Sequence, residues 1–180
     1  MSKALLIIDM INNLDFSQGP KLLEESLPIA ENILNIKKFF KEKNLPIIYV
    51  NDNFGKWKSS WEEVYEECSC AESVGKPLAQ LLKPDKDDYF ILKPKHSGFY
   101  CSNLDVLLND LGVKELVISG IAGNICVLFT VNDAYMRGYS LHVPGNAIAS
   151  VSKELNDFAL TQFKDVFGIN VEHLTHSDHV

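Results

Sequence analysis

The feature that most constrains the fold of this chain is a strand that runs directly into a helix. It lies within residues 115–138, which read ELVISGIAGNICVLFTVNDAYMRG. The run at 116–118 is apolar and rich in β-branched residues, which is typical of a buried parallel strand. Two glycines follow, and apolar residues then recur at helical spacing until Gly138 ends the pattern. The two periodicities meet at Cys126, so the sequence predicts a thiol in the first turn of a helix that follows a strand.

The local sequence gives Cys126 two interpretations. The amides and the dipole at a helix start favour negative charge, which predicts a thiol pKa below the usual value of about 8.5 and hence a nucleophile. Free cysteines are also common as small buried apolar residues, in which case Cys126 only fills space. Both interpretations stay open at this point.

Strands and helices alternate along the whole chain, which predicts a parallel sheet covered by helices on both faces. No repeat and no linker marks a second domain, so residues 1–180 are predicted to form one domain. The predicted strands are residues 4–8, 46–50, 89–92, 116–118, 139–143 and 170–173. One predicted helix begins near Ser26, and the others cover residues 76–82, 103–111, the segment after Cys126, and 152–163.

Composition excludes several classes of partner. A net charge of −7 argues against nucleic acid or an anionic membrane surface as the main partner. The apolar run at 4–8 is too short for a signal peptide or a membrane span, so we expect a cytoplasmic protein with reduced thiols. The four cysteines show no metal-ligand spacing with histidines, and His173, His176 and His179 are expected to belong to a frayed tail rather than to a metal site.

Three predicted strands each end at a residue that is useful for chemistry. Asp9 follows the first strand, Lys93 follows the strand at 89–92, and Cys126 lies just after the central strand. Each residue alone has a structural explanation, as a loop cap, a solvated cation or a packing residue. Because the carboxyl ends of parallel strands meet at one edge of the sheet, the three together supply a proton acceptor, a cation and a nucleophile.

The segments LLIIDMINN, ILKPKHSGF and GIAGNICVLFTVNDAYMRGYSLHVP resemble the isochorismatase-like cysteine hydrolases in sequence and in order. The resemblance implies a doubly wound, mainly parallel six-stranded sheet and a catalytic triad of Asp9, Lys93 and Cys126. It implies an oxyanion hole made by the backbone amides of Ala122 and Cys126, and a cis peptide between Ile121 and Ala122. Relatives are commonly oligomeric, so a homo-oligomer is expected.

The function implied is hydrolysis of an amide-type C–N bond in a small-molecule substrate through a cysteine thioester. Two alternatives remain: an isochorismatase-type vinyl ether hydrolase, and a non-catalytic relative that binds a small ligand. No cofactor is expected, and no metal either, because the Asp-x-His pair that nicotinamidases of the family carry after the second strand is replaced here by Asn-Asp-Asn at 51–53. The loop that follows is expected to form one wall of the pocket, and the predicted substrate-binding residues are Asn51, Asn53, Phe54, Trp57, Phe99 and Ile121.

Overall fold

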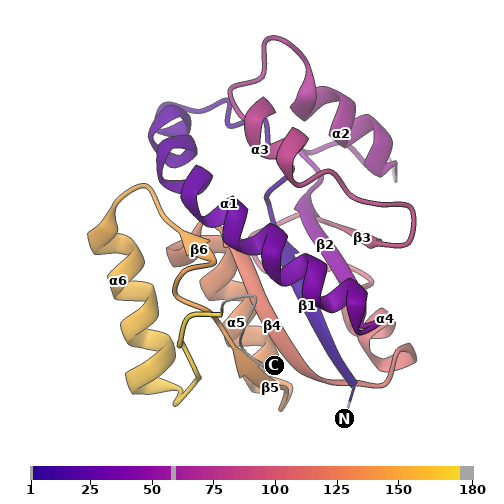
Figure 1. Cartoon of the computed structure of the whole chain (residues 1–180), viewed down its shortest axis with the longest axis vertical. Coiled ribbons are helices and arrows are strands. Elements are labelled where there is room, and N and C mark those ends of the chain that lie inside the picture. Colours follow the sequence, from indigo (N-terminus) through magenta and orange to yellow (C-terminus); the bar gives the residue numbers. More distant parts are fainter. Residues whose placement is uncertain (1, 58–59, 175–180) are drawn as a thin grey trace.

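In the computed structural model of this chain, which describes residues 2–57 and 60–174, six strands form one sheet (Figure 1). The strand order is β3-β2-β1-β4-β5, β6 pairs with β4, and every strand pairing is parallel. The predicted fold class is therefore confirmed. The strands are β1 Ser2–Ile8, β2 Ile47–Asp52, β3 Tyr89–Lys93, β4 Val113–Ile121, β5 Ser140–His142 and β6 Ile148–Ala149.

Helices cover both faces of the sheet. Leu5 and Ile7 of β1 pack in one core cluster with α1, α2 and α3, whereas Leu6 and Ile8 pack in a second cluster with α4, α5 and α6. Because alternate side chains of β1 enter different cores, the strand is apolar at every position from Ala4 to Ile8 rather than at every second one. The helices are α1 Gly19–Glu42, α2 Trp61–Ser69, α3 Lys76–Leu81, α4 Leu104–Asp110, α5 Leu128–Met136 and α6 Lys153–Thr161, with π-helical turns η1 Gly123–Val127 before α5 and η2 Gln162–Val166 after α6.

Two predicted element positions are wrong. Helix α1 begins at Gly19 rather than near Ser26, with a proline in its first turn and Pro28 inside it. Ser26 does not cap the helix, because its buried hydroxyl donates to the Leu22 carbonyl one turn earlier. The sixth strand is β6 rather than residues 170–173, where Asn170 forms a single bridge to β5. A strand of two residues has no periodicity that a sequence pattern can detect.

Smaller differences occur in the loops. The segment after β2, predicted as a loop, contains α2. Residues 58 and 59 of that loop, like His176 and His179, lie outside the described residues. Over residues 2–57 and 60–174, no helix is long and apolar enough to cross a membrane.

The central strands β1 and β4 approach each other closely at their carboxyl ends. Gly120 of β4 has a φ of +115°, and a Cβ at this position would lie 2.1 Å from the Ile8 carbonyl oxygen. Only glycine fits such a position. The close approach brings the end of β1, where Asp9 lies, next to the turn that carries Cys126.

Candidate active site

Asp9 and Lys93 form a buried ion pair at the carboxyl edge of the sheet. The Lys93 Nζ lies 2.8 Å from the Asp9 Oδ2, and both side chains are almost completely buried. Asp9 follows β1 with a φ of +52°, a left-handed conformation that aspartate tolerates better than most residues. Its other carboxylate oxygen, Oδ1, accepts a hydrogen bond of 2.7 Å from the Asp52 amide at the end of β2. Three neighbouring strands therefore fix the orientation of one carboxylate.

The Cys126 thiol lies against this ion pair. Its Sγ is 3.7 Å from the Lys93 Nζ and 3.8 Å from the Nδ1 of His96, and the Asp9 carboxylate is close enough to raise the pKa of the thiol. The structure thus brings together the three residues that the sequence placed at separate strand ends. His96, which follows Lys93 closely in the sequence, is a fourth group at the sulfur.

The electrostatics of the thiol contradict the expectation of a lowered pKa. Burial and the negative charge of Asp9 raise the pKa of Cys126, and the Lys93 ammonium opposes this only in part. For Lys93, burial acts against the charged form, but the Asp9 carboxylate and the Cys126 sulfur outweigh it and the pKa is raised. The surroundings of Cys126 therefore favour the protonated form of the thiol.

The turn that carries Cys126 is tied to the strands and helices around it. The Asn124 amide donates a hydrogen bond of 3.1 Å to the hydroxyl of Ser150, which follows β6 and in turn donates to the Asn156 Oδ1 of α6 at 3.2 Å. The Thr130 hydroxyl donates to the Cys126 carbonyl at 2.7 Å. Ser150 and Thr130 are functional positions that sequence reasoning missed, since Ser150 follows the undetected strand and Thr130 lies on the buried face of α5.

The backbone before Cys126 has the geometry that the family resemblance implies. The peptide bond between Ile121 and Ala122 is cis. The Ala122 carbonyl accepts hydrogen bonds from the amides of Ile125 and Val127, at 3.0 and 3.1 Å, which closes the π-helical turn around the cysteine. Ile121 itself is buried at the end of β4.

Two of the predicted substrate-binding residues are buried away from any opening. Asn51 is completely buried, and its side-chain amide donates to the Ile11 carbonyl. The Phe99 ring packs against Tyr139 in the core, with Arg137 over its face. Phe99 is therefore committed to packing, whereas Asn51 keeps one buried side-chain oxygen, Oδ1, without a hydrogen-bond partner.

Three of the other predicted binding residues lie around open hollows beside β2 and β3, whereas Ile121 lines neither of them. Asn53 and Trp57 line a hollow of about 210 Å³, and Asn53 and Phe54 line another of about 330 Å³. Trp57 is 81% exposed, so its indole is free to contact a ligand. The Asn53 Oδ1 already accepts from the Gly55 amide, which leaves only its NH₂ group available.

Comparison with known proteins agrees with this geometry. The sequence model of the isochorismatase domain matches residues 3–173. The chain belongs to the isochorismatase family. It is 47% identical to the uncharacterized isochorismatase family protein YaaI of Bacillus subtilis over 164 residues, which are 91% of this chain and 90% of that protein.

Solved structures similar to this isochorismatase-family protein include two enzymes. N-carbamoylsarcosine amidase from Thermoplasma acidophilum is 27% identical, with a TM-score of 0.75, over 99% of this chain and 98% of that one. Nicotinamidase PncA from Bacillus subtilis is 26% identical, with a TM-score of 0.74, over 96% of this chain and all of that one. An amidase-type hydrolase is therefore supported for the family member described here.

Nicotinamidases of this family carry metal ligands after the second strand. In this isochorismatase-family protein, the residues of the turn after β2 do not fit a metal ion. Asp52 and Asn53 accept hydrogen bonds from the amides of Phe54 and Gly55, so their side chains shape the turn after β2. Within the described ranges, no three His, Cys, Asp or Glu side chains gather closely enough to hold an ion. The absence of a catalytic metal stays a prediction.

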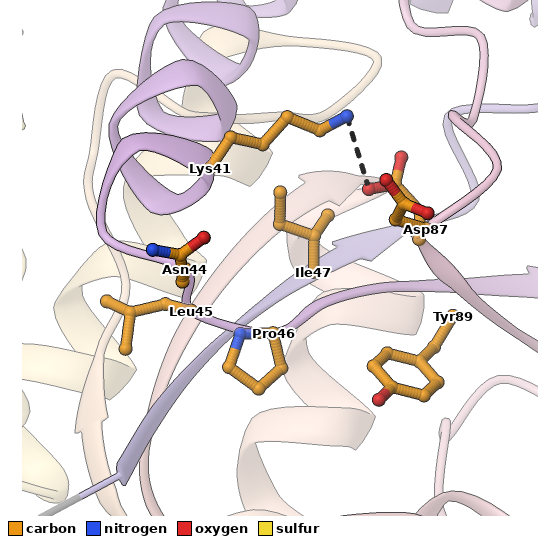
Figure 2. Close-up of a pocket in the computed structure, with 8 residues that line it drawn as sticks. Lys41, Asn44, Leu45, Pro46, Ile47, Asp87 and Tyr89 are labelled. Atoms are coloured by element: carbon orange, nitrogen blue, oxygen red, sulfur yellow. Dashed lines mark ion pairs between the residues drawn. The ribbon is translucent and has the colours of Figure 1, made fainter.

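A further pocket of this isochorismatase-family protein lies away from the chemistry. It has a volume of about 430 Å³ and lies at the amino ends of β2 and β3, whereas Asp9 and Lys93 lie at the carboxyl ends (Figure 2). Figure 2 shows the Lys41 side chain pointing toward the acidic residues of this pocket, and its Nζ is 3.9 Å from the Asp88 Oδ1. No cysteine is among its lining residues, so the carboxyl edge remains the candidate active site. The lining residues are Lys41, Asn44, Leu45, Pro46, Ile47, Asp87, Asp88 and Tyr89.

Proposed function

We propose that this protein is a cysteine hydrolase that cleaves an amide-type C–N bond of a small molecule. One observation carries the proposal: the Cys126 sulfur lies 3.7 Å from the Lys93 ammonium, which itself lies 2.8 Å from the Asp9 carboxylate. A nucleophile, a base and a cation in mutual contact are what acyl transfer to a thiol requires.

Asp9 acts as the general base in the first half of the reaction. Because the pKa of the free thiol is raised, Cys126 reacts as its proton moves to Asp9 while the sulfur attacks the carbonyl carbon. Lys93 remains charged throughout and compensates the negative charge that moves between the carboxylate and the sulfur.

Negative charge then develops on the substrate oxygen. The backbone amides of Ala122 and Cys126 are the donors proposed for this oxygen, since they flank the turn in which the sulfur lies. Asp9 returns its proton to the nitrogen, the C–N bond breaks, and ammonia or an amine leaves. Water hydrolyses the remaining thioester.

The substrate is proposed to be a small amide or ureide that approaches from the hollows beside β2 and β3. The exposed Trp57 offers a flat apolar surface there, and Asn53 offers an amide donor. The N-carbamoyl and carboxamide groups named in the solved relatives have the carbonyl and leaving nitrogen that this mechanism needs.

A panel of primary amides and ureides, including nicotinamide and N-carbamoylsarcosine, would test the proposal by ammonia release. The wild-type protein should turn over at least one compound, and Cys126→Ser, Asp9→Asn and Lys93→Ala should each lower kcat by about a thousandfold or more with circular dichroism unchanged. Repeating the panel with EDTA tests the prediction that no metal takes part.

Two results would favour the alternatives. Vinyl ether hydrolysis needs no nucleophile and releases no ammonia, so cleavage of an added vinyl ether compound that survives Cys126→Ser would point to that reaction. Binding of a compound without release of ammonia, measured by calorimetry, would point to a non-catalytic relative.

A further inference from the structure

His96 contacts the nucleophile and is open to solvent, a combination that neither Asp9 nor Lys93 offers. Its Nδ1 lies 3.8 Å from the Cys126 Sγ, and the residue is exposed. Asp9 and Lys93 contact the same sulfur but are almost fully buried. Among the described residues that contact the sulfur, His96 alone therefore joins it to bulk water.

The backbone on both sides of His96 is held by groups of the site. On one side, the Lys95 carbonyl accepts a hydrogen bond of 3.2 Å from the Lys93 Nζ. On the other side, the Ser97 hydroxyl donates to the Asp133 carboxylate of α5. The residues before and after His96 are therefore both held by hydrogen bonds, which fixes the position of the imidazole relative to the thiol.

A single hydroxyl links the histidine loop to the nucleophile turn. Thr130 accepts a hydrogen bond of 2.9 Å from the Gly98 amide and donates one of 2.7 Å to the Cys126 carbonyl. The imidazole also packs against the ring of Phe129, with the ring centroids 5.5 Å apart. These contacts fix both the backbone and the ring of His96 relative to the sulfur.

We propose that His96 is the proton carrier of the second half of the reaction, the hydrolysis of the thioester. This inference rests on the cysteine hydrolase function proposed above. Once the sulfur carries an acyl group, Asp9 and Lys93 lie on its buried side, and water reaches the thioester from the exposed side. The imidazole is the base on that side.

The proton follows one short route. Water attacks the thioester carbonyl, a C–O bond forms, and the water proton moves to the imidazole. The tetrahedral intermediate collapses, the C–S bond breaks, and the imidazolium returns the proton to the departing sulfur. The products are a carboxylic acid and the free thiol, and no other reactant is consumed.

p-Nitrophenyl acetate is a suitable probe, because it acylates a reactive thiol whatever the natural substrate is. The exposed Cys70 and Cys101 would first be changed to serine, so that they do not contribute. The initial burst of nitrophenolate then reports acylation of Cys126, and the steady-state rate reports hydrolysis of the acetyl-enzyme. We expect His96→Asn to leave the burst unchanged and to lower the steady-state rate by about a hundredfold, with the acetyl adduct visible in the intact mass.

Two controls separate proton transfer from positioning. In His96→Ala, added imidazole should restore the steady-state rate, whereas His173→Asn, a change at another exposed histidine, should leave it unaltered. An unchanged steady-state rate in His96→Asn, or an equal loss in burst and steady state, would overturn the role of His96. Absence of a burst in the wild-type protein, or a burst that survives Cys126→Ser, would instead overturn the proposed function.

Discussion

At the scale of single residues, the protonation state of Cys126 depends on what surrounds the thiol rather than on the helix that carries it. The first turn of the helix favours a thiolate, but burial and the Asp9 carboxylate act in the opposite direction and prevail. A thiol of this kind stays unreactive until a substrate supplies an acceptor for its electrons.

The alkylation rate of Cys126 should reflect this environment. In a protein with Cys70→Ser and Cys101→Ser, iodoacetamide should label Cys126 at pH 7 at least about tenfold more slowly than a free peptide thiol, with the rate still rising above pH 8.5. Lys93→Met should slow labelling further at every pH, since the ammonium lowers the thiol pKa. A rate that has already reached its plateau at pH 7 would contradict the raised pKa.

The sequence was sufficient to predict the positions of Asp9, Lys93 and Cys126, because each lies at the end of an apolar strand and parallel strands end at one edge. It was not sufficient to predict the sign of the thiol pKa shift. That sign depends on burial and on the distance between residues remote in sequence, and local spacing contains neither quantity.

At the scale of elements, the nucleophile turn depends on β6 and α6. Ser150→Ala removes the hydroxyl that joins the Asn124 amide, in the turn that carries Cys126, to the Asn156 side chain of α6. We expect a loss of about 1–3 kcal/mol in the free energy of unfolding and a fall of about tenfold or more in kcat, because a displaced turn misaligns the sulfur. Urea unfolding and ammonia release would measure both.

A neighbouring serine provides the control. Ser152 caps α6 by accepting the Leu155 amide, so Ser152→Ala should cost about 1 kcal/mol of stability and leave kcat unchanged. Equal effects of the two substitutions on kcat would show that Ser150 acts only through general stability.

A buried ion pair joins α1 to the residue that precedes β3. The Lys37 Nζ of α1 lies 2.6 Å from the Asp88 Oδ2 and donates to the Tyr49 hydroxyl at 2.9 Å, while burial and the two acidic neighbours raise the pKa of Tyr49. Asp88→Asn should lower the free energy of unfolding by about 3 kcal/mol, because it leaves a buried ammonium without its main partner.

The comparison for that substitution is Lys41→Ala, which removes an exposed partner of Asp85. This change should cost no more than about 1 kcal/mol, since surface ion pairs contribute little. Urea midpoints that fall equally for both variants would contradict a special role for the buried pair.

At the scale of the whole molecule, the alternation of strands and helices was enough to predict the doubly wound sheet. It was not enough to locate β6, a strand of two residues, or the start of α1, because Pro28 lies inside a helix whose tertiary contacts tolerate it. The prediction was therefore good where long apolar patterns decide the structure and poor where tertiary contacts do.

The homo-oligomer expected from the family remains a proposal. Ile125, Phe129 and Met136 share one side of the η1–α5 helix and are 39%, 50% and 82% exposed, which is a large apolar stripe for a free surface. We expect light scattering to show a dimer or larger assembly at micromolar concentration, and Met136→Glu to shift it toward the monomer. Val106→Glu, at an equally apolar exposed position on α4, should have no effect, and a monomeric wild-type protein would exclude the proposal.

The central place of β1 in the sheet has a consequence for synthesis of the chain. β1 is made first, yet its partner β4 begins at Val113, and the site also needs Cys126. At ribosomal rates of about 5–20 residues per second, on the order of ten seconds separate the two strands as they emerge. During that interval β2 can pair with one edge of β1, but the edge that β4 later covers stays unpaired, which makes this nascent chain a natural client for chaperones, and the candidate site is complete only after most of the protein has been translated.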